Sequence, residues 1–372
     1  MFIVKRVGLL LLLVALLYNR ATSAQQDSAA SEHHANNIYL DVVVTPKSGS
    51  PVTGLSLRDF TLLDNKVPQT ITSFRALGGA DAPAEVIVLL DAVNAKPETI
   101  AYERNQIDEF LTANGGRLPH PTTFAVFTDA DTRIHPGFTT DGKALSASLN
   151  DVIVSIRTVG PSAGFEGSTE RVQLSLKAME TIAAYEAPRP GRKLVLWISP
   201  GWPLLSNPGE VIQFTSLQLQ RMFANIVSLS TQLRQARITL YSIDPLGVED
   251  IGIRTSAYAA YLKGVSKPED VEPGNMGLQV FAVHSGGLVL NSGNDLAELL
   301  QKCLSDTEAY YEISFEPAPA GQRDEYHHLE MRIAKPGLSA RTRQNYYALP
   351  ATATNTTLTW PTSEAQGGGN TR

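Results

Sequence analysis

The chain has 372 residues, which is enough for one large domain and a smaller one. Its composition is ordinary, with 43% apolar residues, 18% charged residues, 28 glycines and 22 prolines, so collagen-like, coiled-coil and wholly disordered chains are excluded. The formal net charge is −6 and no run of lysine or arginine occurs, so we expect no nucleic-acid partner. The single cysteine, Cys303, cannot form an internal disulfide, and its apolar helical surroundings predict a buried, inert thiol.

Residues 1–24 have the three parts of a signal peptide. Lys5 and Arg6 come first, a short apolar run continues to Tyr18, and small residues at positions 22–24 end the segment. The apolar run is shorter than the roughly 20 residues that a membrane-spanning helix needs. We therefore predict an exported protein, periplasmic or extracellular, with no membrane insertion after cleavage. An uncleaved N-terminal anchor is the alternative.

Two β segments flank a longer central region. A polar linker over residues 25–37 leads to the N-terminal β segment, residues 38–80, which shows strand and turn patterns and no helix. The C-terminal β segment covers residues 307–349, and a tail rich in Thr, Asn and Gly follows over residues 350–372, where we expect disorder. Each β segment is too short to bury a core alone, so we predict that the two pair into one small β-sandwich.

Residues 84–306 alternate between strand and helix patterns. The strand patterns are mostly continuous apolar runs, which are typical of parallel strands covered on both faces, and apolar residues at helical spacing lie between them. We predict an α/β domain with a doubly wound, mostly parallel sheet, inserted in the β-sandwich. The expected strands are Val86–Leu90, Thr123–Phe127, Leu194–Ile198, Ile238–Ile243 and Leu288–Leu290.

In an open α/β sheet, ligands bind beyond the carboxyl ends of the strands. The residues that directly follow the expected strands are therefore candidates for a binding site. They include Asp91 and Asn94 after the first strand, Asp129 after the second and Ser199 after the third. The stretch 245–275 follows the fourth strand, at the same edge of the sheet.

Three kinds of site are disfavoured by the sequence. A dinucleotide site needs glycines in the first strand-to-helix turn, and residues 91–96 contain none. A serine hydrolase with Ser199 as nucleophile lacks the glycine two positions before the serine, and Pro200 has no N–H to donate to an oxyanion. Neighbouring residues on a strand face opposite sides, so His327 and His328 cannot chelate one metal ion together.

Several motifs, in order along the chain, resemble a von Willebrand factor A-type domain. A strand ends in Val88-Leu-Leu-Asp91, Gly167-Ser-Thr169 opens a later helix, and Lys193-Leu-Val-Leu-Trp-Ile-Ser199 forms a further strand. The flanking motifs resemble the von Willebrand factor A-related group of exported bacterial proteins, and the resemblance covers roughly residues 38–348. These flanking motifs are Val52-Thr-Gly-Leu-Ser-Leu-Arg-Asp-Phe60, Pro190-Gly-Arg-Lys193, Tyr241-Ser-Ile-Asp-Pro245 and Pro336-Gly-Leu with Tyr346-Tyr-Ala.

The resemblance implies a metal-ion-dependent adhesion site, at which domains of this type bind Mg²⁺ together with a carboxylate of the ligand. Asp91 keeps the first metal-ligand position, and Thr169 matches the loop threonine. Val93 and Ala95 occupy the two serine positions and Pro200 occupies the later aspartate position, so these three supply no side-chain oxygen. We therefore expect a degenerate site with no metal and no cofactor. The alternative is that Mg²⁺ binds at Asp91 and Thr169 with non-standard ligands in the other positions.

Simple structural roles are also open to several of these residues. Asp91 could cap the helix after the first strand, and Ser168 or Thr169 could be the N-cap of a helix over residues 170–185. Asp129 or Asp131 could supply an oxygen to a rebuilt site, although nothing in the sequence requires it.

These observations favour an exported, non-enzymatic module that binds an unidentified protein or glycan partner at the carboxyl edge of its sheet. A metal-dependent adhesion domain with non-standard ligands is one alternative, and a serine hydrolase is a less favoured one. The predicted binding residues are Asp91, Asn94, Asp129, Ser168, Thr169 and Ser199.

Overall fold

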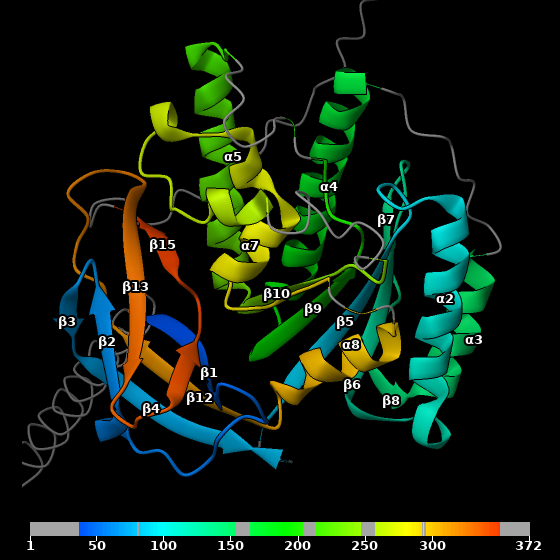
Figure 1. Ribbon diagram of the computed structural model, residues 1–372, viewed down its shortest axis with the longest axis horizontal. Coiled ribbons are helices and arrows are strands. Elements are labelled where there is room, and N and C mark those ends of the chain that lie inside the picture. Colours follow the sequence, from blue (N-terminus) through cyan, green and yellow to red (C-terminus); the bar gives the residue numbers. More distant parts are fainter. Residues whose placement is uncertain are drawn as a thin grey trace, which may run out of the picture.

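The computed structural model of the chain describes residues 37–79, 82–153, 164–203, 205, 213–246, 257–291, 293 and 295–349. The predicted signal peptide, the predicted linker up to residue 36 and the predicted tail all lie outside the described residues. Among the described helices, none has the length and apolar character that crossing a membrane requires. The described chain forms an α/β unit and, beside it, a unit of antiparallel β-strands (Figure 1).

A seven-stranded sheet forms the centre of the α/β unit, in the order β11-β10-β9-β5-β6-β7 with β8 paired to β6. Five of its strands are parallel, as predicted, and every residue of β9 and β10 is buried. The sequence did not predict β7 and β8, which run antiparallel to β6 and have only three residues each. The strands are Ala84–Asp91 (β5), Arg117–Phe127 (β6), Thr132–Ile134 (β7), Thr139–Asp141 (β8), Arg192–Ile198 (β9), Ile238–Ile243 (β10) and Val289–Leu290 (β11).

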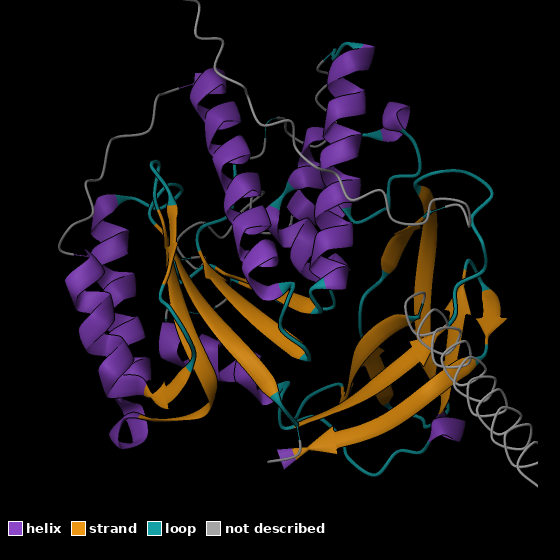
Figure 2. Cartoon of the chain, turned by 180° about the vertical axis from the view of Figure 1, so that it is seen from behind, coloured by secondary structure: helices purple, strands orange, loops and turns teal. Residues whose placement is uncertain are grey.

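Helices cover both faces of this sheet, which makes it doubly wound (Figure 2). Along β5, Ile87 and Leu89 face a core shared with α4, α5 and α7, whereas Val86 and Val88 face a core shared with α2, α3 and α8. The helices are Pro97–Thr112 (α2), Gly142–Ile153 (α3), Gly164–Glu186 (α4), Ser216–Gln235 (α5), Leu278–His284 (α7) and Leu296–Ser305 (α8). Short 3-10 turns are Leu57–Asp59 (η1), Ala113–Gly116 (η3), Tyr258–Tyr261 (η4), Pro268–Asp270 (η5) and Pro273–Met276 (η6).

The N- and C-terminal β segments pair with each other, as predicted, and form two four-stranded antiparallel sheets. One sheet has the order β14-β1-β12-β4 and the other β15-β13-β2-β3, so each contains strands from both segments. Apolar residues from both sheets share one core, which includes Leu40, Leu62 and Ile313. The strands are Ile38–Pro46 (β1), Phe60–Asp64 (β2), Val67–Gln69 (β3), Ile71–Gly78 (β4), Ala309–Phe315 (β12), Glu325–Ile333 (β13), Leu338–Arg341 (β14) and Asn345–Ala348 (β15).

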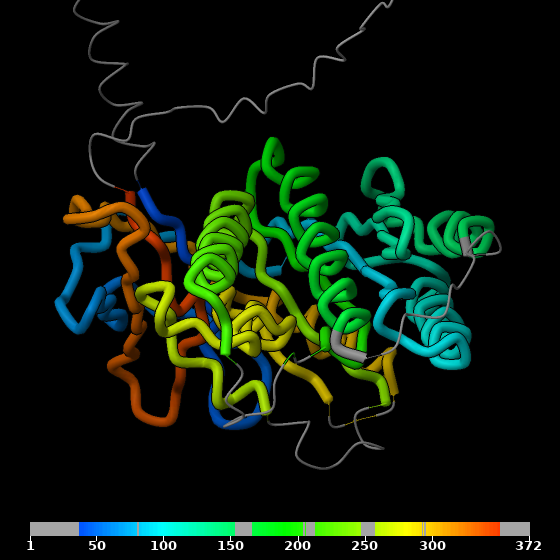
Figure 3. The backbone as a smooth tube through the Cα atoms, turned by 90° about the horizontal axis from the view of Figure 1, so that it is seen from above, coloured from blue at the N-terminus to red at the C-terminus, as the bar shows by residue number. Residues whose placement is uncertain are grey.

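The β-sandwich lies at one end of the molecule, next to α5 (Figure 3). Tyr347 of β15 packs into the core that α5 shares with the sheet, and its hydroxyl donates to the main-chain O of Val265 at 2.9 Å. Arg237, which follows α5, contacts Asp41 of β1 at 2.5 Å and Glu312 of β12 at 2.7 Å. The two units therefore share both apolar contacts and buried ion pairs.

Candidate functional site

Asp91 is the last residue of β5, at the carboxyl edge of the central sheet, and it is fully buried. The main-chain N–H groups of Val93 and Asn94 donate to its Oδ1 at 3.0 and 2.9 Å. Its Oδ2 accepts from Nδ2 of Asn94 at 2.8 Å and from the indole Nε1 of Trp197 at 2.9 Å. Both oxygens thus have two donors each. Helix α2 has Lys96 as its N-cap, so Asp91 caps the turn before the helix and not the helix itself.

The hydrogen-bonded carboxylate of Asp91 lies next to a cluster of aromatic side chains. Trp197 packs edge-on against Phe127 and Trp202, with ring centroids 5.9 and 5.3 Å apart. Burial raises the pKa of Asp91, and hydrogen bonds from Asn94 and Trp197 oppose part of that rise because they favour the charged form. The carboxylate is therefore a structural hydrogen-bond acceptor that is closed off from solvent.

These residues do not fit a Mg²⁺ ion, which prefers an octahedral shell of oxygen ligands at about 2.0–2.1 Å. The indole of Trp197 and the amide nitrogen of Asn94 place N–H donors on the carboxylate oxygen that a cation would need. Val93 and Ala95 supply no oxygen from the serine positions of the motif. Within the described ranges, no group of three His, Cys, Asp or Glu side chains is placed to hold a metal ion.

Helix α4 contributes to this network through a residue that the sequence motifs did not indicate. The helix begins at Gly164, so the prediction of an N-cap at Ser168 or Thr169 is wrong and both residues lie inside the helix. Ser168 accepts a hydrogen bond from Arg171 at 3.3 Å. The contact with the Asp91 network comes from buried Ser175, two helical turns beyond Ser168, whose Oγ accepts from Nδ2 of Asn94 at 3.0 Å.

The remaining predicted residues, Asp129 and Ser199, differ in exposure. Asp129 is exposed in a turn after β6, which is closed by a hydrogen bond from the main-chain N of Thr128 to the main-chain O of Asp131 at 2.9 Å. Ser199 is fully buried after β9, and its Oγ accepts from the main-chain N of Gly201 at 3.1 Å. A hydroxyl enclosed in this way is inaccessible to a substrate, which argues against Ser199 as a nucleophile.

Glu103 is a buried carboxyl group that the sequence analysis did not single out. It lies on α2 and is fully buried, and neither of its carboxyl oxygens has a hydrogen-bond partner in the described part of the chain. Burial and the charges of Asp91 and Asp244 raise the pKa of Glu103 well above its ordinary value, which favours the neutral form. Its spacing from Ile100 and Ile107, both buried on the same helix, is the sequence signal that could have revealed it.

Two predictions about residues away from this edge are confirmed. Cys303 is fully buried on α8, and burial raises the pKa of its thiol well above the ordinary value, as expected for an inert cysteine. His327 and His328 face opposite sides of β13. His327 is buried with its Nδ1 2.9 Å from a carboxylate oxygen of Asp64, whereas His328 is exposed.

No protein-family model matches the chain, and no curated protein matches it. The solved structures with some similarity include manganese-loaded TRAP protein from Plasmodium vivax, at 8% identity and a TM-score of 0.33 over 74% of this chain and 98% of that one. Proximal thread matrix protein 1 from the mussel byssus has 11% identity and a TM-score of 0.34 over 74% of this chain and 51% of that one. A mutant of the PilB minor pilin from Streptococcus sanguinis has 10% identity and a TM-score of 0.31 over 60% and 62%. All three likenesses are distant, and they assign no family.

Proposed function

We propose that the protein is an exported, non-enzymatic binding module of the von Willebrand factor A type, with a degenerate adhesion site that works without a metal ion. The observation that carries this proposal is the saturated carboxylate of Asp91, whose two oxygens accept four hydrogen bonds from protein donors. In a metal-dependent site the same carboxylate would have to face a cation. In this chain the carboxylate of Asp91 instead joins the end of β5 to the turn that follows it and to Trp197 of β9.

The surface that we propose for partner binding is the exposed turn of residues 128–131, with Asp129 at its centre. The stretch 245–275 supplies less of the proposed partner-binding surface than its position after the fourth strand suggested. In its described part, the 3-10 turns η4 to η6 pack on α5 and α7, and Tyr261 is buried. Ser199 and Asp91 are fully buried and would not touch a partner.

A calorimetric titration with Mg²⁺ and Mn²⁺ tests whether the module is metal-free. After chelator treatment, the protein is expected to show neither binding heat nor a shift in melting temperature with either ion, because Asp91 has no free lone pair to offer. An Asp91→Asn variant runs beside it as the control. Binding in the wild type that disappears in the variant would establish the metal-dependent alternative and overturn this part of the proposal.

Site-specific photo-crosslinking tests the proposed surface. A photoreactive residue at Asp129 is expected to crosslink a cell-envelope protein or glycoprotein, with an equal yield in the presence of a chelator. The matched control is Lys143, which is also exposed but lies beside the start of β6, at the opposite edge of the sheet. Equal crosslinking from both positions, or none from Asp129, would contradict binding at the carboxyl edge.

A further inference from the structure

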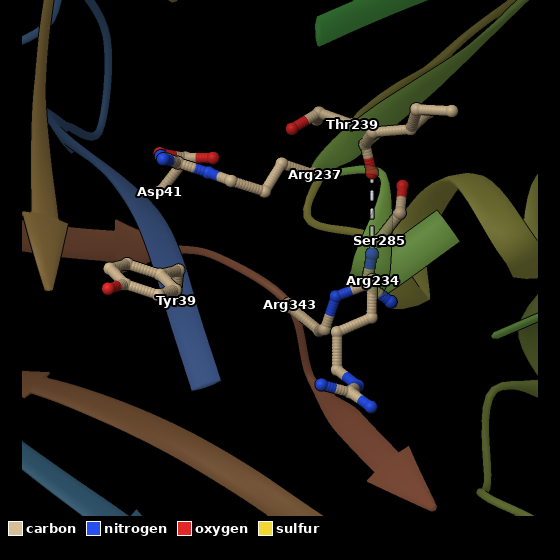
Figure 4. A pocket seen from close by; sticks show the side chains of 8 residues that line it. Tyr39, Asp41, Arg234, Arg237, Thr239, Ser285 and Arg343 are labelled. Atoms are coloured by element: carbon tan, nitrogen blue, oxygen red, sulfur yellow. Dashed lines mark hydrogen bonds and ion pairs between the residues drawn. The ribbon is translucent and has the colours of Figure 1, made fainter. Parts of the chain in front are cut away.

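Three arginines meet at the amino end of the central sheet, on the side opposite Asp91. Arg234 lies in the last turn of α5, Arg237 follows the end of that helix, and Arg343 comes from the segment that leads into β15. They line a small pocket between the first residues of β10 and the β-sandwich, together with Tyr39 and Asp41 (Figure 4). Nothing in the proposed function uses this pocket.

Arg237 has its charge neutralised within the protein. Its guanidinium contacts Asp41 at 2.5 Å and Glu312 at 2.7 Å, and it lies over the ring of Tyr39 at 5.5 Å. Burial by itself would lower the pKa of Arg237, but the charges of Asp41 and Glu312 outweigh burial and raise it. Both nearby carboxylates therefore pair with Arg237, and Glu312 also pairs with Arg75.

Arg234 and Arg343 have no such partner among the described residues. Arg343 is buried, and its guanidinium donates one hydrogen bond, from Nη2 to the main-chain O of Ile238 at 3.3 Å. Arg234 makes no ion pair in the described part of the chain, and its Nε is buried without a hydrogen-bond partner. A guanidinium has five N–H donors, so most of the donors of this pair make no hydrogen bond to another described residue.

The two arginines also repel each other. Burial and the positive charge of Arg234 lower the pKa of Arg343 to about 9, although the charge of Asp41 opposes part of this fall, and burial lowers the pKa of Arg234. Two guanidinium groups that lie close together without an ion-pair partner of their own destabilise the empty protein, because each is partly or fully removed from water. An anion between the two guanidinium groups would supply a negative charge and accept hydrogen bonds from their N–H groups.

We propose that this pocket binds a carboxylate group, held between the guanidinium groups of Arg234 and Arg343. Planar guanidinium forks match the two oxygens of a carboxylate, and each can donate two parallel hydrogen bonds to it. The pocket has room for about one water-sized group, about 10 Å³, so a carboxylate would place one oxygen inside it and keep the rest of the molecule outside. The carboxylate belongs either to a small organic acid or to an acidic side chain of a protein.

The test is a thermal-unfolding titration of the full chain in which sodium acetate replaces sodium chloride at constant ionic strength. Acetate at ten times its dissociation constant is expected to raise the melting temperature by about 3 °C. Arg234→Gln and Arg343→Met are each expected to weaken acetate binding at least tenfold. Arg221→Gln, an exposed arginine on the same helix, is the matched control and should leave the acetate effect unchanged.

Two further readouts make the outcome decisive. Without acetate, Arg343→Met should unfold at the same or a higher temperature than the wild type, because it removes an unpaired buried charge. A blocked pentapeptide with one central glutamate, compared with its glutamine counterpart, distinguishes a protein-borne carboxylate from a free acid. No preference for acetate over chloride, an equal acetate effect in both pocket variants, or stronger binding of phosphate than of acetate would each overturn the proposal. Metal titration and crosslinking at Asp129 are independent of all these results.

Discussion

Replacing Arg237 with methionine is expected to lower the free energy of unfolding by about 3–5 kcal/mol. Arg237 bridges Asp41 and Glu312, and the three side chains have exposed fractions of only 17%, 8% and 7%. Removing the cation leaves two carboxylates close together, largely buried and without this counter-charge. Arg75 still contacts Glu312 at 2.6 Å, but it is itself 61% exposed and compensates little. Chemical denaturation of the purified protein measures the loss.

Arg133→Met is the matched control for this prediction. Arg133 also pairs with an aspartate, Asp131, at 3.0 Å, but both side chains are about half exposed, so the expected loss is below about 1 kcal/mol. Combining Arg237→Met with Asp41→Asn and Glu312→Gln should restore part of the lost stability, because no uncompensated charge stays buried. A loss below about 1 kcal/mol for Arg237→Met alone would show that the two units do not depend on this ion pair.

The fold class could be predicted because the central strands are buried on both faces. The run Leu194–Ile198 is continuously apolar, and in a chain whose strands alternate with helices this pattern is typical of a parallel sheet between two helical layers. The strands β7 and β8 could not be predicted, because three residues carry no periodicity. The start of α4 was placed too late because Gly167 and Ser168 have low helix propensity, and tertiary packing overrides it there.

The candidate site was predicted only in part, for a different physical reason. Asp91 and Asn94 could be found from their position after a buried strand, which is local information. Their partners Trp197 and Ser175 lie far along the chain, and only the pairing of β5 with β9 and the packing of α4 bring them near Asp91. The motif positions show which metal ligands are missing, but they do not reveal which donors take the place of the cation.

Glu103→Gln is expected to stabilise the protein by about 2–3 kcal/mol at pH 8, because it removes a buried carboxyl group that has no hydrogen-bond partner in the described part of the chain. The size of this effect should depend on pH. Burial, together with the charges of Asp91 and Asp244, raises the pKa of Glu103 well above the ordinary value of 4.5 in the folded state. Between these two pKa values, the folded protein holds a proton that the unfolded chain has released.

The free energy of unfolding of the wild type should therefore fall as the pH rises from about 4.5 through the folded-state pKa of Glu103. Glutamine has the shape of the protonated side chain and does not titrate, so the advantage of Glu103→Gln should vanish near pH 4 and grow towards pH 8. Denaturant melts across this range measure it, with Glu98→Gln, an exposed glutamate of the same helix, as the control without effect. An advantage that is equal at every pH would mean that Glu103 does not titrate differently in the folded and unfolded states. The destabilisation by Glu103 would then come from packing, and not from the charge of its carboxylate near Asp91 and Asp244.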